Sequence, residues 1–212
     1  MIELILLGGG GHCESVIEVI LGLREYTIRG ILDPSYNSSK PQEVMGFPIL
    51  GDDTDIVKHV NKQRQFVITV GQIKSSQVRR NLFDLVTDNG GKLPVIIAKS
   101  AYVSSSAKLS EGTVVLHNAF VNANTQIGNC CILNTGAIVE HGCTIGSFTH
   151  VSTGSILNGE VVCGENVFIG SGTVLNQGVS LADNVIIASG SLVRKSIDFP
   201  SIYGGNPLKR IM

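Results

Sequence analysis

The chain of 212 residues is long enough for two small domains, and its 16 basic and 17 acidic residues give a formal net charge of −1. This near-neutral balance offers no broad positive field, so nucleic acid and membrane surfaces are not expected partners. No stretch approaches the roughly 20 apolar residues of a membrane span, and the apolar start of the chain lacks the positive region of a signal peptide. We therefore expect a cytoplasmic protein.

The N-terminal part of the chain alternates short apolar runs with segments that have helical spacing. The apolar runs predict strands at Glu3–Leu7, Ile28–Leu32, Phe66–Val70 and Val95–Ala98, with a minor strand at Pro48–Leu50, and the helical spacing predicts helices at Glu14–Leu23 and Ser75–Asp88. Alternating strands and helices indicate a parallel sheet with crossover helices. Residues 1–96 are therefore predicted to form an α/β, Rossmann-like domain.

Four consecutive glycines, Gly8 to Gly11, follow the first predicted strand and precede His12. Glycines at a strand-to-helix turn let the backbone approach a diphosphate, and the start of the next helix adds unpaired N–H groups. Asp33 ends the second strand, where its carboxylate would accept hydrogen bonds from a ribose or base. The third glycine of a dinucleotide fingerprint would fall at Cys13, so the match is incomplete. These residues predict a nucleotide site, and a tight structural turn is the alternative.

Sixteen consecutive six-residue units run from Ala101 to Ser196, and their third position is Val, Leu or Ile in every unit except the one with Cys163. A six-residue period does not fit an α-helix, whose period of about 3.6 residues would place successive apolar residues on different faces. Three units make one triangular coil of eighteen residues, and stacked coils bury the third positions in a central column. Residues 97–212 are predicted to form an all-β left-handed parallel β-helix, whose handedness rests on resemblance to hexapeptide-repeat proteins.

A residue in such a rod lies beneath the residue eighteen positions later. His141 is therefore expected beneath Gly159 and above Ala123, and these small neighbours leave room for a ligand. The backbone N–H of Gly159 would lie where it can approach a reacting carbonyl. His117, on another face, is expected to be a surface or subunit-contact residue. His141 is thus the candidate for catalysis, and an ordinary surface histidine is the alternative.

The stretch Asn134–Val151, which reads NTGAIVEHGCTIGSFTHV, resembles the NeuD/PglD-type sugar acetyltransferases. This family pairs an N-terminal nucleotide-sugar-binding domain with a left-handed β-helix that holds acetyl-CoA. The resemblance covers nearly the whole chain, including the turn at Gly8–His12 and the closing segment Gly204–Lys209. It implies an acetyl-CoA-dependent N-acetyltransferase that acts on a nucleotide-linked amino sugar, with a UDP-4-amino-deoxy sugar expected, for the synthesis of bacterial surface glycans or sialic-acid-like sugars.

The same resemblance implies roles for single residues. His141 would be the general base that removes a proton from the sugar amine, and the backbone N–H of Gly159 would stabilise the oxyanion. The other implied contacts are Gly8, Gly11, His12, Asp33 and Asn134 for the nucleotide sugar, and His150, Gly159, Gly205, Pro207 and Lys209 for acetyl-CoA. The resemblance also implies a homotrimer with active sites between subunits, and no metal.

Leu208 and Cys13 are lesser departures from the family pattern. The departure that matters is Gly142, which stands where an acidic residue usually follows the catalytic histidine. A carboxylate there would fix the imidazole tautomer and stabilise its charged form.

Three other functions stay open from the sequence. They are O-acetylation of a sialic-acid-like sugar, nucleotide-sugar sensing without catalysis, and a zinc enzyme that uses His117, His141 and His150 from adjacent subunits.

Overall fold

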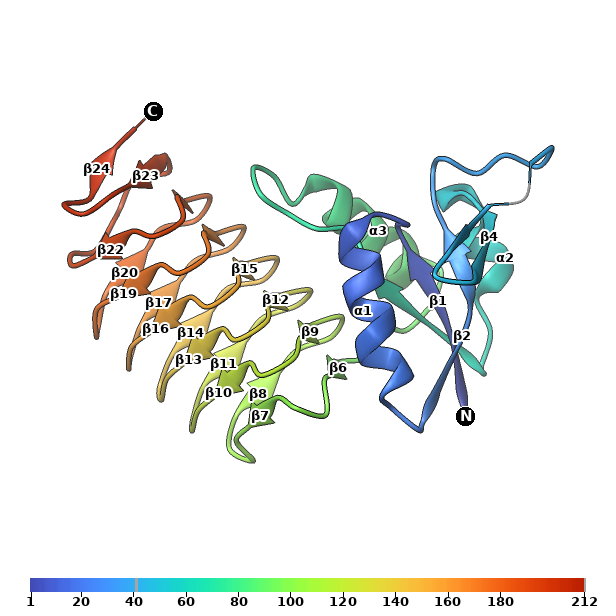
Figure 1. The fold of residues 1–212 in the computed structure, drawn as a ribbon, viewed down its shortest axis with the longest axis horizontal. Coiled ribbons are helices and arrows are strands. Elements are labelled where there is room, and N and C mark those ends of the chain that lie inside the picture. The colour runs from blue at the N-terminus through green and yellow to red at the C-terminus, as the bar shows by residue number, and fades with distance from the viewer. Residues whose placement is uncertain (41, 212) are drawn as a thin grey trace.

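The computed structural model describes residues 1–40 and 42–211, which form an α/β domain followed by a rod of stacked coils (Figure 1). The strands of the α/β domain are β1 (Ile2–Leu7), β2 (Tyr26–Leu32), β3 (Glu43–Val44), β4 (Phe47–Gly51) and β5 (Arg64–Ile68). They form one sheet in the order β3-β4-β2-β1-β5, in which only the β3-β4 pair is antiparallel among the described residues. The predicted Rossmann-like arrangement is confirmed.

Side chains of β1 point alternately to the two faces of this sheet. Leu4 and Leu6 pack with α1 (Gly11–Leu21), whereas Ile5 and Leu7 pack on the other face with α3 (Gln77–Asp88). The short helices η1 (Asp53–Asp55) and α2 (Ile56–His59) lie between β4 and β5 in the chain, and Ile56 packs on the α3 side. Both faces of β1 are therefore covered, which explains its continuous apolar sequence.

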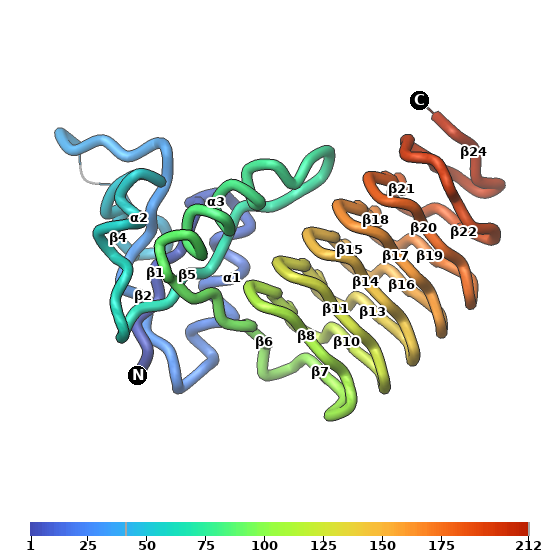
Figure 2. The backbone as a smooth tube through the Cα atoms, turned by 180° about the vertical axis from the view of Figure 1, so that it is seen from behind, coloured from blue at the N-terminus to red at the C-terminus, as the bar shows by residue number. Residues whose placement is uncertain are grey.

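The rod is a stack of similar coils (Figure 2). It has one two-residue strand per hexapeptide unit, and strands eighteen residues apart pair in parallel, as Phe120 pairs with Ile138. Sheet C contains β6 (Ile96–Ile97), β9 (Val114–Val115), β12 (Ile132–Leu133), β15 (His150–Val151), β18 (Phe168–Ile169), β21 (Ile186–Ile187), β23 (Ile202–Gly204) and β24 (Lys209–Arg210). Sheet D contains β7 (Tyr102–Val103), β10 (Phe120–Val121), β13 (Ile138–Val139), β16 (Ile156–Leu157), β19 (Val174–Leu175) and β22 (Leu192–Val193). Sheet E contains β8 (Lys108–Leu109), β11 (Gln126–Ile127), β14 (Thr144–Ile145), β17 (Val162–Cys163) and β20 (Ser180–Leu181). The predicted left-handed parallel β-helix is confirmed.

Third-position side chains fill the centre of the rod and are buried in every unit from Val115 to Val193. Each such aliphatic side chain contributes about 1.5–3 kcal/mol on burial. First-position side chains add a second link between coils, because they donate to backbone carbonyls fifteen residues later. Thr125 Oγ1 donates to the carbonyl of Glu140 at 3.1 Å, and Cys143 Sγ occupies the equivalent place beneath Asn158 at 3.3 Å. The rod is therefore a rigid frame in which residues eighteen apart keep fixed neighbours.

Helix α1 lies between the sheet and the rod, so the two parts of the chain share one apolar core (Figure 1). Val16 and Ile17 of α1 belong to the same buried cluster as Ile96 and Val114 of sheet C.

At the far end of the rod, β24 runs antiparallel to β23. No helix among residues 1–40 and 42–211 is long and apolar enough to cross a bilayer.

Several bounds in the N-terminal domain differ from the sequence-based expectation, such as β5, which spans Arg64–Ile68 instead of Phe66–Val70. Two further differences have an identifiable cause. The predicted strand Val95–Ala98 is reduced to β6, and it pairs with β9 of the rod instead of joining the domain's sheet. The helix expected from Glu14 begins three residues earlier, at Gly11, because Gly10 takes the extended conformation of an N-cap. Both differences arise where the chain passes from one element to another, which periodicity locates poorly.

Candidate active site

A cavity of about 710 Å³ lies between the N-terminal domain and the rod. Its wall includes the start of α1, the loop after β5 and the corner after β12, with Gly11, His12, Gln72, Asn134, Thr135 and His150 among the lining residues. The cavity therefore joins the predicted nucleotide turn to the rod residues that sequence analysis assigned to the acceptor sugar and acetyl-CoA.

His150 lies at the centre of the contacts between the two domains. Its Nδ1 lies 2.8 Å from the backbone carbonyl of Gln72, and its Nε2 lies 3.1 Å from Nδ2 of Asn134. Because a carbonyl accepts, Nδ1 carries the proton and Nε2 accepts from the Asn134 amide. Burial, and to a lesser degree the charge of Arg79, lower the pKa of His150 to about 4, although the bond to Gln72 acts in the opposite direction. His150 is therefore neutral at pH 7, with one defined tautomer.

Arg79, in α3, provides a positive charge behind the cavity. Its side chain is buried, and its guanidinium donates to the backbone carbonyls of Val70, at 2.6 Å, and of Cys130 in the rod. Burial, followed by the nearby Arg79 and His150, lowers the pKa of His12 to about 3, so this ring is also neutral. Because both histidines are neutral, the positive charge beside the cavity comes from the buried Arg79, and this charge favours an anionic ligand.

The glycine turn after β1 is held in place by Asp33. One oxygen of the Asp33 carboxylate accepts from the backbone N–H of Gly9 at 2.6 Å, and the other accepts from the N–H of Ser35 at 2.8 Å. Although burial acts in the opposite direction, hydrogen bonds from Ser35 and Gly9 lower the pKa of Asp33. Gly8 has φ +102°, and a Cβ on it would lie 2.6 Å from a methyl group of Val70. The turn therefore requires glycine at position 8, and Asp33 fixes its shape.

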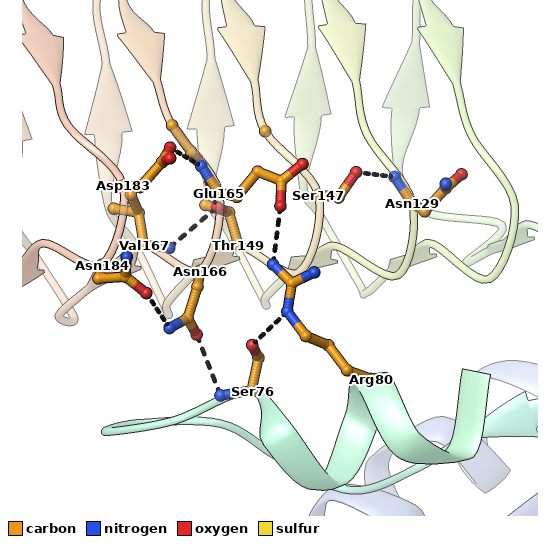
Figure 3. Close-up of polar contacts among 12 residues, drawn as sticks. Ser76, Arg80, Asn129, Ser147, Thr149, Glu165, Asn166, Val167, Asp183 and Asn184 are labelled. Atoms are coloured by element: carbon orange, nitrogen blue, oxygen red, sulfur yellow. Dashed lines mark hydrogen bonds and ion pairs between the residues drawn. The ribbon is translucent and has the colours of Figure 1, made fainter. Parts of the chain in front are cut away.

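Polar contacts between the start of α3 and the rod hold the loop at residues 71–76 in place (Figure 3). Oδ1 of Asn166 accepts from the backbone N–H of Ser76 at 3.0 Å and from Nε2 of Gln72 at 3.2 Å. Arg80 pairs with Glu165 at 2.8 Å. These contacts fix the position of Gln72, whose carbonyl in turn orients the His150 ring.

His141 and Gly159 form a second candidate site at the corner that follows β13. A Cβ on Gly159 would lie 2.6 Å from Cε1 and 2.7 Å from Nε2 of His141, so the imidazole occupies the space that any larger residue would need. The predicted stacking of His141 beneath Gly159 is confirmed by this contact. His141 is exposed and does not line the cavity that contains Asn134 and His150. Within one chain, His141 therefore lies apart from the cavity that contains Asn134 and His150.

Comparison with known proteins identifies the family of this chain. The family model described as the PglD N-terminal domain matches residues 3–86, and the model described as bacterial transferase hexapeptide (six repeats) matches residues 160–195. The acetyltransferase domain of PglB from Neisseria gonorrhoeae is 30% identical, with 99% of each chain covered and a TM-score of 0.91. The chain belongs to the PglD/NeuD-type sugar acetyltransferases.

A second solved structure of the same identity agrees with this membership, and a more distant one shows the fold. PerB from Caulobacter crescentus, solved in complex with CoA and GDP-perosamine, is 30% identical, with 99% of this chain and 97% of that chain covered and a TM-score of 0.90. WeeI from Acinetobacter baumannii shares the fold over the full length of both chains, with 15% identity and a TM-score of 0.75. A comparison with curated proteins found no match.

The C-terminal residues expected to contact acetyl-CoA in this PglD/NeuD-type acetyltransferase lie elsewhere, at the end of the rod. Pro207 lines a separate cavity of about 350 Å³, beside Arg194, Lys195 and Arg210. Gly205 adjoins this cavity with φ +94°, and Lys209 is exposed in β24. Within one chain, the structure does not bring these residues into the cavity that contains His150.

Several residues around the candidate site of this PglD/NeuD-type chain were not found from the sequence. Gln72, Arg79 and Asn166 orient His150 or join the two domains, yet each lies in a loop, helix or corner with no motif of its own. The basic pair Arg194-Lys195 could have indicated the cavity at the end of the rod, because two adjacent cations interrupt the otherwise small and apolar repeats there.

Two of the three histidines named in the zinc alternative have partners within the chain. His117 Nδ1 lies 3.0 Å from the hydroxyl of Ser100, and both ring nitrogens of His150 already have partners within the chain. No group of three or more His, Cys, Asp or Glu residues suited to a metal ion occurs in the described part of this PglD/NeuD-type chain.

Proposed function

We propose that this protein transfers the acetyl group of acetyl-CoA to the amino group of a nucleotide-linked amino sugar. The observation that carries the proposal is the contact between the His141 imidazole and Gly159, in a chain whose full-length relative PerB was solved with CoA and an amino-sugar nucleotide. A base and a backbone donor at one corner of the rod suit acyl transfer from a thioester.

In the proposed reaction, His141 removes a proton from the sugar nitrogen as that nitrogen forms a bond to the thioester carbonyl carbon. The backbone N–H of Gly159 makes no hydrogen bond within the part of the chain that the structure describes, so it is available to the developing oxyanion. The carbon–sulfur bond then breaks, and His141 returns the proton to the leaving thiolate of CoA.

We place the nucleotide sugar in the cavity between the domains, with Gly8, Gly11, His12 and Asp33 forming or supporting the nucleotide side and Asn134 facing the amine. Sequence resemblance favours a UDP-linked 4-amino sugar. The similarity to PerB makes a GDP-linked amino sugar the second candidate, because that enzyme was solved with GDP-perosamine. Variants of that enzyme with one histidine replaced by asparagine or alanine were also solved with CoA and GDP-perosamine.

We place acetyl-CoA along the rod, with its reacting end near His150 and Gly159 and its nucleotide end near Gly205, Pro207 and Lys209. The cavity at that end supports the placement, because Arg194 and Lys195 line it and supply positive charge for phosphate groups.

We propose that copies of the chain assemble side by side into a trimer, which brings His141 of one copy to the cavity of another. Outward side chains of sheet D form an apolar column, namely Tyr102, Phe120, Ile138, Ile156, Val174 and Leu192. Those of sheet E are mostly polar, namely Lys108, Gln126, Thr144, Val162 and Ser180. A cyclic trimer needs a second, different patch on each copy, and Phe168, Ile186 and Ile202 of sheet C supply an apolar one.

The test is release of free thiol from acetyl-CoA with UDP-, GDP- and CMP-linked amino sugars and with free sialic-type acids. Turnover on one nucleotide amino sugar that falls by about 10²–10⁴-fold in His141→Ala supports the proposal. Turnover on sialic-type acids alone would establish O-acetylation instead. Binding of nucleotide sugar without thiol release would establish a sensor, and stoichiometric zinc in active protein would favour the metal enzyme.

A further inference from the structure

The corner that carries His141 has two nearby carboxylates, and only one of them is free to reach the ring. Glu140 precedes His141, but its Oε2 accepts from Nδ2 of Asn122 at 2.5 Å, which holds this carboxylate against the coil below. Gly142 follows His141 and has no side chain. An imidazole that takes up a proton is assisted by an acceptor that fixes its tautomer and stabilises its charged form. Neither neighbour of His141 in the sequence is placed to do this.

The eighteen-residue coil places Glu160 directly above Gly142. The backbone N–H of Glu160 donates to the carbonyl of His141 at 2.9 Å, so the two corners are in register. Gly142 has φ +68° and Glu160 has φ +63°, which is the same left-handed corner conformation. A Cβ built on Gly142 would lie 3.4 Å from Cγ of Glu160. The Glu160 side chain therefore extends back over Gly142, within van der Waals contact of the place that a Cβ at position 142 would take.

The imidazole of His141 lies at the same corner. It packs against Gly159, the residue immediately before Glu160, with Nε2 2.7 Å from where a Cβ of Gly159 would be. The Glu160 carboxylate is exposed and makes no hydrogen bond or ion pair within residues 1–40 and 42–211. It is therefore free to turn toward the ring, whereas the carboxylate of Glu140 is held by Asn122.

We propose that Glu160 is the positioning residue of His141, and that it supplies from the next coil the carboxylate that position 142 lacks. Glu160 accepts a hydrogen bond from the imidazole nitrogen that does not face the substrate, which orients the ring and stabilises it when it holds the amine proton. This inference rests on the proposed function, because it gives His141 the role of general base.

The test compares Glu160→Gln with wild type in the thiol-release assay. Glutamine has the same size but no charge, so we expect kcat to fall by about 10- to 100-fold, a part of the 10²–10⁴-fold that a positioned base contributes. The KM values for both substrates should stay within about twofold, because Glu160 touches neither. In a His141→Ala background, Glu160→Gln should cause no further loss, since a residue that acts through another has no effect without it.

A double variant tests whether a carboxylate at position 142, one coil below, can replace that of Glu160. Gly142→Asp combined with Glu160→Gln should recover much of the lost kcat, because it returns an acidic group to the same corner. Asn124, one coil below Gly142, has φ +57°, so this corner accepts a side chain, and aspartate tolerates that conformation. Glu18→Gln, on the exposed face of α1 beyond its first turn, is the matched control and should retain wild-type kcat.

Two results would overturn the inference while leaving the proposed function intact. One is wild-type kcat in Glu160→Gln when His141→Ala is inactive, and the other is an equal loss from Glu160→Gln with and without His141. Failure of the proposed function appears differently, as wild-type protein that releases no thiol with any amino-sugar nucleotide. That result would also remove the role assigned to Glu160.

Discussion

The imidazole of His150, in the rod, donates from Nδ1 to the backbone carbonyl of Gln72, in the N-terminal domain, at 2.8 Å. This bond requires a protonated Nδ1, while the Asn134 amide donates to Nε2 and requires that nitrogen to be bare. If Nε2 also took up a proton, it could no longer accept from the Asn134 amide, and two N–H donors would face each other. The contact between the domains and the wall of the cavity therefore depend on one neutral histidine.

Stability should fall as the pH drops below 6.5, because the folded chain resists protonation of His150. The unfolded histidine binds a proton near pH 6.5, whereas the folded one has a pKa of about 4. Between these values the unfolded state holds more protons, so this side chain alone lowers the free energy of unfolding by up to about 1.4 kcal/mol per pH unit. Urea denaturation at several pH values from 8 to 4.5 measures the slope.

The variant His150→Gln isolates this contribution. It should have a smaller slope below pH 6.5, whatever its stability at pH 8, because it lacks the titrating ring. An unchanged slope in the variant would show that His150 is not the group responsible. His12, with a pKa of about 3, should contribute in the same direction.

Asn166→Gly should loosen the loop at residues 71–76 without unfolding the chain. Glycine suits the φ of +55° at this position and removes the oxygen that accepts from Ser76 and Gln72. Two lost hydrogen bonds amount to about 1–3 kcal/mol. Hydrogen exchange at residues 71–76 should accelerate, and KM for the nucleotide sugar should rise. Asn184→Gly suits the φ of +60° at that position, removes only the neighbouring side-chain partner of Asn166 and is the control, in which exchange of the loop should change little.

Gly159→Ala should reduce kcat while the rod stays folded. The new Cβ would overlap the His141 ring, which lies at the exposed end of a flexible side chain and can move aside. The melting temperature should therefore stay within a few degrees of wild type, and kcat should fall about tenfold or more as the base leaves its position. In a His141→Ala background the alanine should have no further effect on kcat. A comparable loss in that background would show that Gly159 acts independently of the ring.

Ile156→Glu should weaken association between copies of the chain. This side chain lies in the apolar column of sheet D, and a buried unpaired carboxylate there would oppose the proposed side-by-side contact. The matched variant Thr144→Glu places the same charge on the exposed face of sheet E and should keep the wild-type assembly. Size-exclusion chromatography with light scattering measures both. Equal masses for the two variants would argue against sheet D as the interface.

Stacking in the rod could be predicted from the sequence because its period is fixed by covalent length. Adding eighteen to a residue number identifies its neighbour, which is how His141 was placed beneath Gly159. The α/β domain followed for a similar reason, since a sheet covered on both faces needs continuous apolar strands such as β1.

Contacts between the two domains could not be predicted in this way. The bond from His150 to Gln72 joins residues 78 positions apart, and the bond from Arg79 to the carbonyl of Cys130 spans 51 positions. No repeat relates such residues, and their pairing depends on how α3 is set against the rod. The sequence therefore indicated His150 through family resemblance but gave no sign of the carbonyl that orients it.

The last strand of the rod affects how two molecules could associate end to end. β24 runs antiparallel to β23, and its residues Lys209 and Arg210 are both exposed. A stack of parallel rungs that ended without it would present free backbone groups in the register of another rung, ready to pair with a second molecule. Reversed direction and two adjacent cations oppose that pairing. End-to-end pairing of sheet C through β24 is therefore disfavoured.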